Sequence, residues 1–310
     1  MLTEQCTVLC RHCWFESGPK KSDTMTILEA ENYIHQANEF STLEWISFTG
    51  GEPFLLPDML VKLVTHVSSL GLKTECVTNG FWAKTEQIAR TQLRRLKSAG
   101  LDVINLSVDD YHQEFISINN IRHCFNAAKY LDLNVVIMCV LSKSSKLHAK
   151  TIIEHLGDDT IYVPQTDSDR TRLDGITTIL VESGFLPAGR ASNLIAEHVP
   201  DPNLSITGGC PFILRDIVIT PGGRVLPCCS AGALTNPLAV GNINTQPLST
   251  IIEEANKHHL IKFLVKYGPH ELFRQMGPFN ISNEVKYTSK CHLCYEILSK
   301  HRLNKLISGI

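Results

Sequence analysis

The sequence lacks the features that mark membrane-spanning, secreted and nucleic-acid-binding proteins. Its longest pure apolar run, "VVIMCVL" (135–141), has the length of a strand, far short of the roughly 20 residues of a membrane span. The 29 Lys and Arg residues nearly balance the 31 Asp and Glu residues, so no basic footprint for nucleic acid is present. The five residues before Cys6 leave no room for the charged and apolar regions of a signal peptide. These absences predict a cytoplasmic protein with no nucleic-acid or membrane partner.

Cysteine, by contrast, is abundant. The chain has 11 cysteines among 310 residues. In a reducing compartment such a number indicates metal or redox chemistry and not disulfide bonds. Three cysteines lie close together at the start of the chain, and a second set lies far along it, at Cys210, Cys228, Cys229, Cys291 and Cys294.

The first two-thirds of the chain alternates strand-like and helix-like segments. Strands are expected at 44–48, 73–80, 102–109, 134–141 and 177–181, and helices at 26–37, 58–71, 85–100, 120–131 and 144–156. Counting a very short strand before Cys6, this gives about six βα units and a parallel sheet. A complete eight-unit barrel typically takes about 250 residues, so about six units within 200 residues predict a partial (β/α)6 TIM-like barrel.

The pattern changes near residue 200. "DIVITPGGRVLP" (216–227) is typical of a hairpin around a Pro-Gly-Gly turn, a helical region is expected at 249–277, and a closing helix is expected near "CHLC". We therefore expect a barrel over 1–200 and a small α+β domain over 201–310.

The stretch "CTVLCRHC" (6–13) places Cys6, Cys10 and Cys13 at a spacing that suits three ligands of one metal centre. Three thiolates can hold three irons of a [4Fe–4S] cluster, which leaves the fourth iron open to a ligand. A zinc site completed by His12 and a chance grouping are the alternatives, but a histidine between two ligands on so tight a loop is poorly placed to bind the same metal. The spacing favours the cluster.

This CxxxCxxC motif resembles the signature of the radical S-adenosylmethionine (SAM) enzymes, and "TGGEP" (49–53), at the end of an expected strand, resembles their second signature. In that family the amino and carboxylate groups of SAM chelate the open iron. An electron from the cluster cleaves SAM to a 5′-deoxyadenosyl radical, which takes a hydrogen atom from the substrate. The resemblance implies that SAM and a [4Fe–4S] cluster are cofactors of this chain and that a flavodoxin- or ferredoxin-type partner reduces it.

The resemblance also implies which strand-end residues face SAM, because barrels keep their active sites at the carboxyl ends of their strands. A turn role for Asn79 and a structural ion pair for Arg190 are equally compatible with their positions. The expected SAM-binding residues are Gly50, Gly51, Glu52, Pro53, Asn79, Ser107, Asp109 and Arg190.

Four cysteines of the second set supply a complete ligand set: Cys210, Cys228, Cys291 and Cys294. Spacing alone leaves zinc and iron–sulfur open, since a hairpin followed by C-x2-C is common zinc architecture. The region resembles the twitch domain, the short form of the SPASM domain, which implies one auxiliary [4Fe–4S] cluster. No winged-helix peptide-recognition domain of the kind that many peptide-modifying relatives carry precedes the barrel.

Cys229 directly follows Cys228, so both cannot easily bind one cluster from an extended segment. It is either a spare thiol, a ligand in place of Cys228, or a hydrogen-atom donor. Several phrases, including "SVDDYHQEF" and "PCCS", resemble radical SAM peptide epimerases, in which the thiol after the cluster cysteine is the donor. The same resemblance suggests that Asp216 positions that thiol or the peptide, although it could equally cap the hairpin.

The sequence therefore favours a radical SAM enzyme acting on a ribosomally made peptide, with L-to-D epimerisation as the leading outcome. A small-molecule dehydrogenase of the aminocyclitol type and a non-catalytic iron–sulfur or zinc protein are the alternatives. The isolated cysteines, Cys76, Cys124 and Cys139, are expected to pack as small hydrophobic residues.

Overall fold

The computed structural model describes residues 1–164, 177–197, 206–275 and 287–300. They form two compact units: Met1–Arg11 with Glu16–Ser183, and His12–Phe15 with Gly184–Ile310. The domain boundary expected at residue 200 falls within 198–205, outside the described residues, and stays a prediction.

The first unit alternates strands and helices as its sequence predicts. Its elements are α1 (Ile27–Asn38), β1 (Trp45–Phe48), the 3-10 turn η1 (Pro53–Leu55), α2 (Pro57–Ser69), β2 (Lys73–Thr78), α3 (Glu86–Ala99), β3 (Val103–Ser107), α4 (Asp110–Gln113), α5 (Ile118–Tyr130), β4 (Asn134–Leu141), α6 (Ala149–Leu156) and β5 (Thr178–Gly184).

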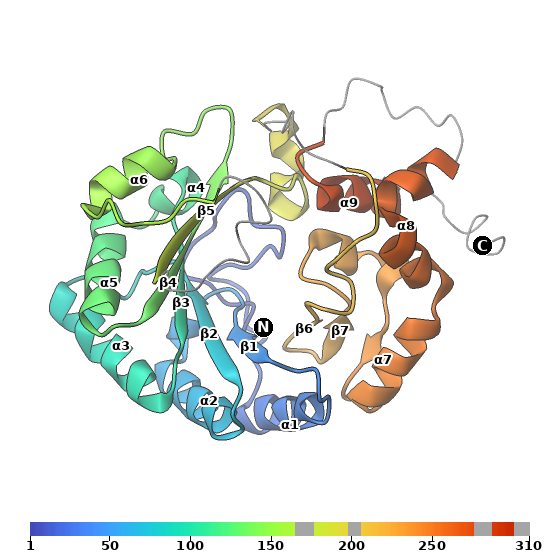
Figure 1. The fold of residues 1–310 in the computed structure, drawn as a ribbon, viewed down its shortest axis with the longest axis horizontal. Helices are drawn as coiled ribbons and strands as arrows, with labels where there is room; N and C mark the ends of the chain where they lie inside the picture. Colours follow the sequence, from blue (N-terminus) through green and yellow to red (C-terminus); the bar gives the residue numbers. More distant parts are fainter. Residues whose placement is uncertain (165–176, 198–205, 276–286, 301–310) are drawn as a thin grey trace. The chain divides into compact units, whose positions relative to one another are not determined.

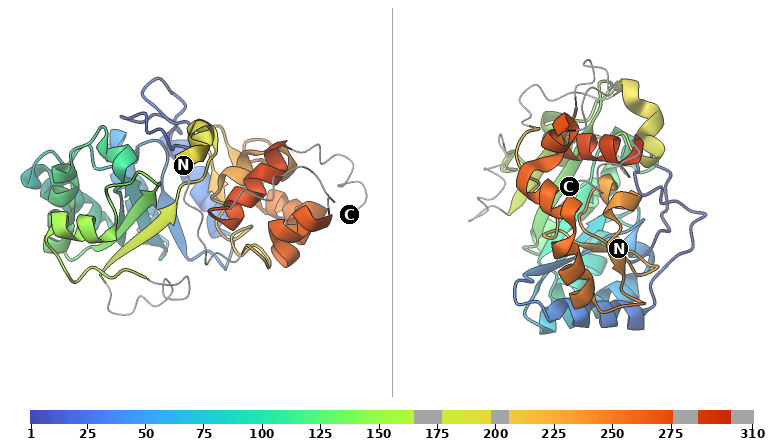
Figure 2. Two further views of the ribbon diagram at one scale, coloured as in Figure 1. Left: turned by 90° about the horizontal axis from the view of Figure 1, so that it is seen from above. Right: turned by 90° about the vertical axis from the view of Figure 1, so that its right-hand side faces the viewer.

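The strands form one sheet in the order β1-β2-β3-β4-β5, and the pairs from β1 to β4 are parallel. The backbone N–H of Val135 donates to Thr177 O beside β5. Helices α1, α2, α3, α5 and α6 lie along one face of this sheet (Figures 1 and 2). The unit is thus an α/β partial barrel, and every crossover returns the chain so that successive strands end at the same edge.

The very short first strand expected before Cys6 is not part of this sheet, which has five strands. Residues 2–5 instead run beside the loop that follows β1. The N–H of Leu2 donates to Thr49 O, and Thr3 O and Gln5 O accept from Gly51 and Glu52. The cysteine loop is therefore tied to the carboxyl end of β1 by backbone hydrogen bonds.

Local sequence signals explain where the helices begin and end. Thr26 and Glu29 form the expected capping box at the start of α1, with Thr26 N donating to Glu29 Oε2 over 2.7 Å. Gly100 ends α3 with φ of 106°, a left-handed conformation that glycine adopts without a Cβ clash.

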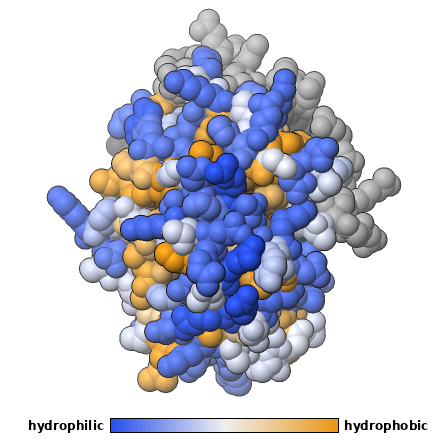
Figure 3. Space-filling model, turned by 90° about the vertical axis from the view of Figure 1, so that its left-hand side faces the viewer, coloured by the Kyte–Doolittle hydropathy of each residue, from blue (hydrophilic) through white to orange (hydrophobic). Residues whose placement is uncertain are grey.

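Burial alternates along the central strands. In β3, Ile104 and Leu106 are fully buried, whereas Val103, Asn105 and Ser107 on the opposite face are only partly buried. The face of the molecule shown in Figure 3 is mainly hydrophilic, with scattered hydrophobic side chains.

The second unit holds the expected hairpin. Its strands β6 (Val218–Ile219) and β7 (Arg224–Leu226) pair antiparallel, and β8 (Gly241–Asn242), which the sequence did not predict, extends the sheet. The other elements are the 3-10 turns η3 (Gly189–Glu197), η4 (Ala231–Leu234) and η5 (Asn236–Leu238), and the helices α7 (Leu248–Lys257), α8 (His259–Gln275) and α9 (Lys290–Lys300).

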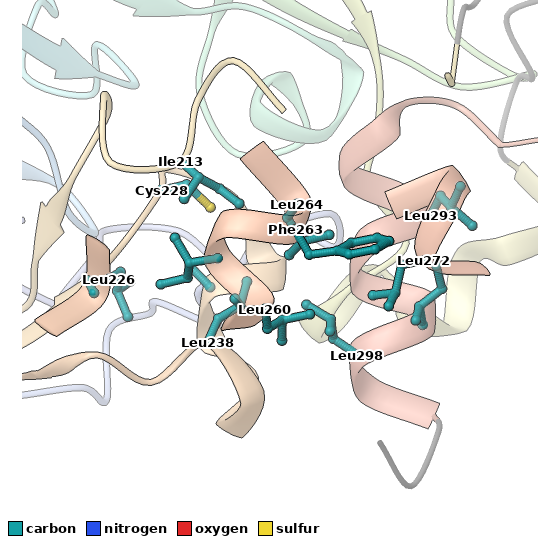
Figure 4. Packing of buried hydrophobic residues seen from close by; sticks show 14 residues of the cluster. Ile213, Leu226, Cys228, Leu238, Leu260, Phe263, Leu264, Leu272, Leu293 and Leu298 are labelled. Carbon is teal, nitrogen blue, oxygen red and sulfur yellow. The ribbon is translucent and has the colours of Figure 1, made fainter. Parts of the chain in front are cut away.

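A hydrophobic cluster organises this unit. Leu264 of α8 and Leu293 of α9 are fully buried in it, and Leu226 of the hairpin belongs to the same cluster. Cys228 lies at one side of it, beside Ile213 (Figure 4). The packing thus brings the hairpin and the last helix, which carry the second cysteine set, onto one core.

Within the described ranges, no helix is long and apolar enough to cross a membrane.

Candidate active site

The loop 6–13 carries the first cysteine set, and none of its three cysteines is in a disulfide. Cys6 and Cys10 are buried and Cys13 is half-buried. The amide Nδ2 of Asn79, at the end of β2, lies 3.7 Å from Cys6 Sγ and donates toward it. A donor aimed at this sulfur suits a thiolate, the form in which cysteine binds iron, so the residues fit the cluster that the motif implies.

The two glycines of "TGGEP" make room for the chain itself. Gly50 has φ of 154°, and a Cβ there would lie 2.4 Å from Thr3 O; a Cβ at Gly51 would lie 2.0 Å from Gln5 O. Real Cβ atoms do not approach a carbonyl oxygen so closely. Both positions require glycine because the segment that leads into the cysteine loop passes directly over them.

Glu52 joins the ends of two neighbouring strands. Its side chain is fully buried, and Oε1 accepts from Thr78 Oγ1 (2.8 Å) and Phe54 N (3.1 Å), while Oε2 accepts from Asn79 N (2.9 Å). Burial raises the pKa of this carboxyl to about 7, against the opposing effect of the hydrogen bonds. The structure thus gives both carboxylate oxygens of Glu52 partners within the protein, next to Pro53, which begins η1.

Asn79 has the turn role that its sequence position allowed and a second set of contacts. Its Oδ1 accepts from Phe81 N over 3.0 Å, which is a side-chain-closed turn. Its Nδ2 donates to Cys6 and to Thr7 Oγ1 (3.3 Å). One side chain therefore shapes the turn after β2 and contacts the cysteine loop.

Asp109 lies just beyond the end of β3, where Ser107 is the last residue. Its Oδ1 accepts from His112 N (3.0 Å), so it caps α4, and its Oδ2 lies 2.9 Å from His112 Nδ1. Burial on its own would lower the pKa of His112, but Asp109 and the adjacent Cys10 outweigh it, and the net shift is well upward. The sequence alone assigned no role to His112. Its position three residues after a helix-capping aspartate could have indicated a contact between the two side chains.

Arg190 belongs to η3, in the second unit. Its backbone N–H donates to Cys13 O over 3.3 Å. The neighbouring Gly189 has φ of 56°, and a Cβ there would lie 2.6 Å from Trp14 O. The "PAGRA" segment therefore supports the end of the cysteine loop through its backbone.

Four cysteines of the second set act on one another electrostatically. Burial raises the pKa of Cys294 well above its usual value, and the nearby Cys228, Cys291 and Cys210 raise it further. Burial likewise raises the pKa of Cys228 to about 12. Neighbouring cysteines of this kind fit a thiolate-binding metal centre.

Cys229 and Cys228 differ in exposure. Cys228 is buried in the hydrophobic cluster, whereas Cys229 is exposed. Its Sγ lies 4.0 Å from Asp216 Oδ2, and Arg215 holds that carboxylate with two hydrogen bonds of 3.0 and 2.9 Å. Desolvation by the surrounding protein, followed by the charge of Asp216, raises the pKa of the Cys229 thiol to about 11.

The isolated cysteines pack as predicted. Cys76 in β2, Cys124 in α5 and Cys139 in β4 are fully buried, and burial raises the pKa of each. They are small core residues with no tendency to ionise.

Comparison with known proteins agrees with this arrangement. Residues 1–131 match the radical SAM superfamily, and residues 210–295 match the SPASM iron–sulfur cluster-binding domain. The chain is 24% identical over 271 residues to YydG of Bacillus subtilis (strain 168), which is named for peptide biosynthesis; the match covers 86% of this chain and 79% of YydG.

Two further relatives cover less. The PqqA peptide cyclase of Methylocella silvestris is 26% identical over 74% of this chain and 66% of its own. The GTP 3′,8-cyclase of Chlorobaculum tepidum is 31% identical over 42% of this chain and 38% of its own. A solved structure, methylornithine synthase (PylB), aligns at a TM-score of 0.41 and 14% identity, over 60% of this chain and 52% of that one.

Residues 1–131 thus carry a radical SAM domain and residues 210–295 a SPASM-type domain. Its cofactors are accordingly SAM and a [4Fe–4S] cluster, with auxiliary iron–sulfur in the second domain. The cysteine loop fits the former and the converging second set fits the latter.

The network of Glu52 generates a first prediction. A Glu52→Gln variant keeps the size of the side chain, but its amide NH2 group cannot accept from a backbone N–H. We predict a loss of about 1–3 kcal/mol in unfolding free energy, measured by anaerobic urea denaturation without SAM. Glu154→Gln, an exposed substitution on α6, is the matched control and should change stability little. Equal stability of the two variants would mean that Glu52 does not join the strand ends.

Proposed function

We propose that this enzyme modifies a ribosomally made peptide, and that it inverts the α-carbon of one residue from L to D. The observation that carries the proposal is the pair Cys228–Cys229, one thiol buried among the second cysteine set and the next exposed beside Asp216. An enzyme that only removes hydrogen needs no such second thiol.

The relatives support the peptide substrate. YydG is named for peptide biosynthesis, and the PqqA cyclase is named for a peptide that it cyclises. Both similarities extend well beyond the length of the barrel match, over 86% and 74% of this chain. The relatives named for GTP chemistry match less than half of it.

The proposed reaction divides between cofactor and protein. Bound SAM and its cluster supply a 5′-deoxyadenosyl radical that removes the α-hydrogen. The remaining carbon radical is nearly planar and has lost its handedness. Cys229 then delivers the hydrogen atom of its weak S–H bond to the opposite face, and Asp216, held by Arg215, orients the thiol. The thiyl radical left on Cys229 returns to the thiol by taking one electron from the flavodoxin- or ferredoxin-type reductant and one proton from solvent.

The ligand assignments belong to the same proposal. Cys6, Cys10 and Cys13 hold the first cluster, and Cys210, Cys228, Cys291 and Cys294 hold one auxiliary [4Fe–4S] cluster. The strand-end residues Gly50, Gly51, Glu52, Pro53, Asn79, Ser107 and Asp109, with Arg190, form the surroundings of SAM. A flavodoxin- or ferredoxin-type protein in the cytoplasm supplies the electron.

The ligand assignment predicts the iron content. After anaerobic reconstitution we expect about eight irons per chain, about four for each cluster. The triple variant Cys6→Ala, Cys10→Ala, Cys13→Ala should hold half of that and make no 5′-deoxyadenosine. Cys124→Ala, a buried cysteine outside both sets, is the control and should keep the full amount. Tightly bound zinc in place of the second set of irons would contradict the auxiliary cluster.

The donor role predicts an isotope pattern. Short peptides encoded beside the gene are the candidate substrates. In deuterium oxide the product should gain one deuterium at the inverted carbon, because the thiol exchanges with solvent. Cys229→Ser, which keeps the shape but has a stronger O–H bond, should retain both clusters and cleave SAM without inverting the residue. Chiral analysis of the hydrolysed peptide together with mass spectrometry measures both.

Three results would count against epimerisation. Loss of two hydrogens from the peptide would indicate cyclisation or dehydrogenation. Full inversion by Cys229→Ser would remove the donor role. Loss of the auxiliary cluster in that variant would make Cys229 the ligand in place of Cys228.

A further inference from the structure

The turn that follows β3 contacts the cysteine loop at Cys10. The His112 ring lies next to the Cys10 sulfur: one of its nitrogens, a ring nitrogen of His12 and Cys10 Sγ all lie within 4.8 Å of one another. The His112 ring is also held by Asp109, whose Oδ2 lies 2.9 Å from Nδ1. The imidazole thus contacts a carboxylate and lies beside a thiol.

The carboxylate and the thiol that neighbour the ring are both buried. Asp109 is 1% exposed and also receives the His112 backbone N–H, so the carboxylate and the ring cannot move independently. Cys10 is buried. An imidazole that is held by a carboxylate at one nitrogen is a recurring device for aiming the other nitrogen at a metal or its ligand.

A second set of contacts holds the segment after β3 against the cysteine loop. Arg11, next to Cys10, forms an ion pair with Glu114, and its Nε donates to Glu114 Oε1 over 3.1 Å. The Arg11 guanidinium also lies over the ring of Tyr111, 5.5 Å from its centroid. Tyr111 and Glu114 flank His112 in the sequence, so the placement of His112 against Cys10 is held from both sides.

From this geometry we propose that His112, positioned by Asp109, donates a hydrogen bond to the Cys10 sulfur of the first cluster and thereby raises the reduction potential of that cluster. A cluster-bound cysteine is a thiolate and can only accept, so the ring N–H that faces it donates. Hydrogen bonds to cluster sulfurs stabilise the reduced, more negative state. His112 is thus a positioning and tuning residue for electron entry, and the inference does not depend on which substrate the enzyme modifies.

The competing roles for His112 make different demands. A direct iron ligand would need its lone pair on the metal and could not hydrogen-bond Cys10 with the same nitrogen. A residue that only packs would leave the potential of the cluster unchanged when a side chain of similar size replaces it.

The potential is measured on the reconstituted holoenzyme. Reductive titration is followed by electron paramagnetic resonance (EPR), and the first cluster is recognised as the signal that changes when SAM is added. We expect His112→Ala to disfavour reduction of this cluster about tenfold, which corresponds to 59 mV for a one-electron couple. His112→Gln keeps an N–H donor and should recover most of the loss.

His123→Ala is the matched control. His123 is also a partly buried histidine of the first unit, and its ring contacts the backbone oxygen of Ala83 over 3.0 Å. Its replacement should leave the potential of the first cluster unchanged. Equal shifts in His112→Ala and His123→Ala would overturn the proposal, and so would equal shifts in His112→Ala and His112→Gln.

A spectroscopic measurement on the unaltered chain covers the case in which His112→Ala does not retain its cluster. With ¹⁵N-labelled histidine, pulsed EPR of the reduced cluster should show a weak nitrogen coupling, as expected through a hydrogen bond, and His112→Gln should abolish it. A strong coupling typical of a direct ligand, or the absence of any coupling, would overturn the proposal.

Discussion

The candidate site depends on the fact that parallel strands end at one edge, where their unpaired backbone groups must find partners. Glu52 solves this problem for β1 and β2: its two buried oxygens accept from Phe54 N, Asn79 N and Thr78 Oγ1. Without it, backbone donors at the ends of two strands would be buried unpaired. This single carboxylate therefore fixes the geometry on which the cysteine loop rests.

Two consequences follow from that tie. Asn79 is held by Glu52 through its backbone, which directs its side-chain amide to Cys6. Residues 2–5 also pass directly over the loop between β1 and Glu52. Only glycine at positions 50 and 51 leaves space for their carbonyl oxygens. The motif "TGGEP" thus has a structural role in addition to any contact with SAM, because it supports the segment that leads into the cysteine loop.

The fold could be predicted further than the site because the two depend on different kinds of information. Helical spacing, the capping box of α1 and the glycine after α3 are local signals, and the structure confirms those elements. The expected first strand had only the five residues before Cys6, and the unpredicted β8 is two residues long; segments so short are defined by the partners that they meet in space. Their sequences carry too few residues for a period to show.

The same distinction applies to the functional residues. The cysteine spacings carry their chemistry in the sequence, and in the structure Cys228, Cys291 and Cys210 all lie near enough to Cys294 to raise its pKa. Asp109 was expected to face SAM, and the structure shows its carboxylate engaged with His112, whose link to Cys10 joins positions about a hundred residues apart. No local sequence pattern indicates a contact across such a separation. The aspartate–histidine spacing at the start of α4 indicates only the contact between Asp109 and His112.

In the proposed reaction, the adjacent Cys228 and Cys229 meet two opposed chemical requirements. A cluster ligand must give up its proton and be shielded from water, and Cys228 lies within a hydrophobic cluster. A hydrogen-atom donor must keep its proton and be reachable, and Cys229 is exposed beside a carboxylate that disfavours ionisation. Both residues lie in the bend that follows β7, which leaves one thiol in the core and the next at the surface. The proposal therefore needs no further element to place a ligand and a donor one residue apart, and the carboxylate of Asp216 acts on the exposed thiol.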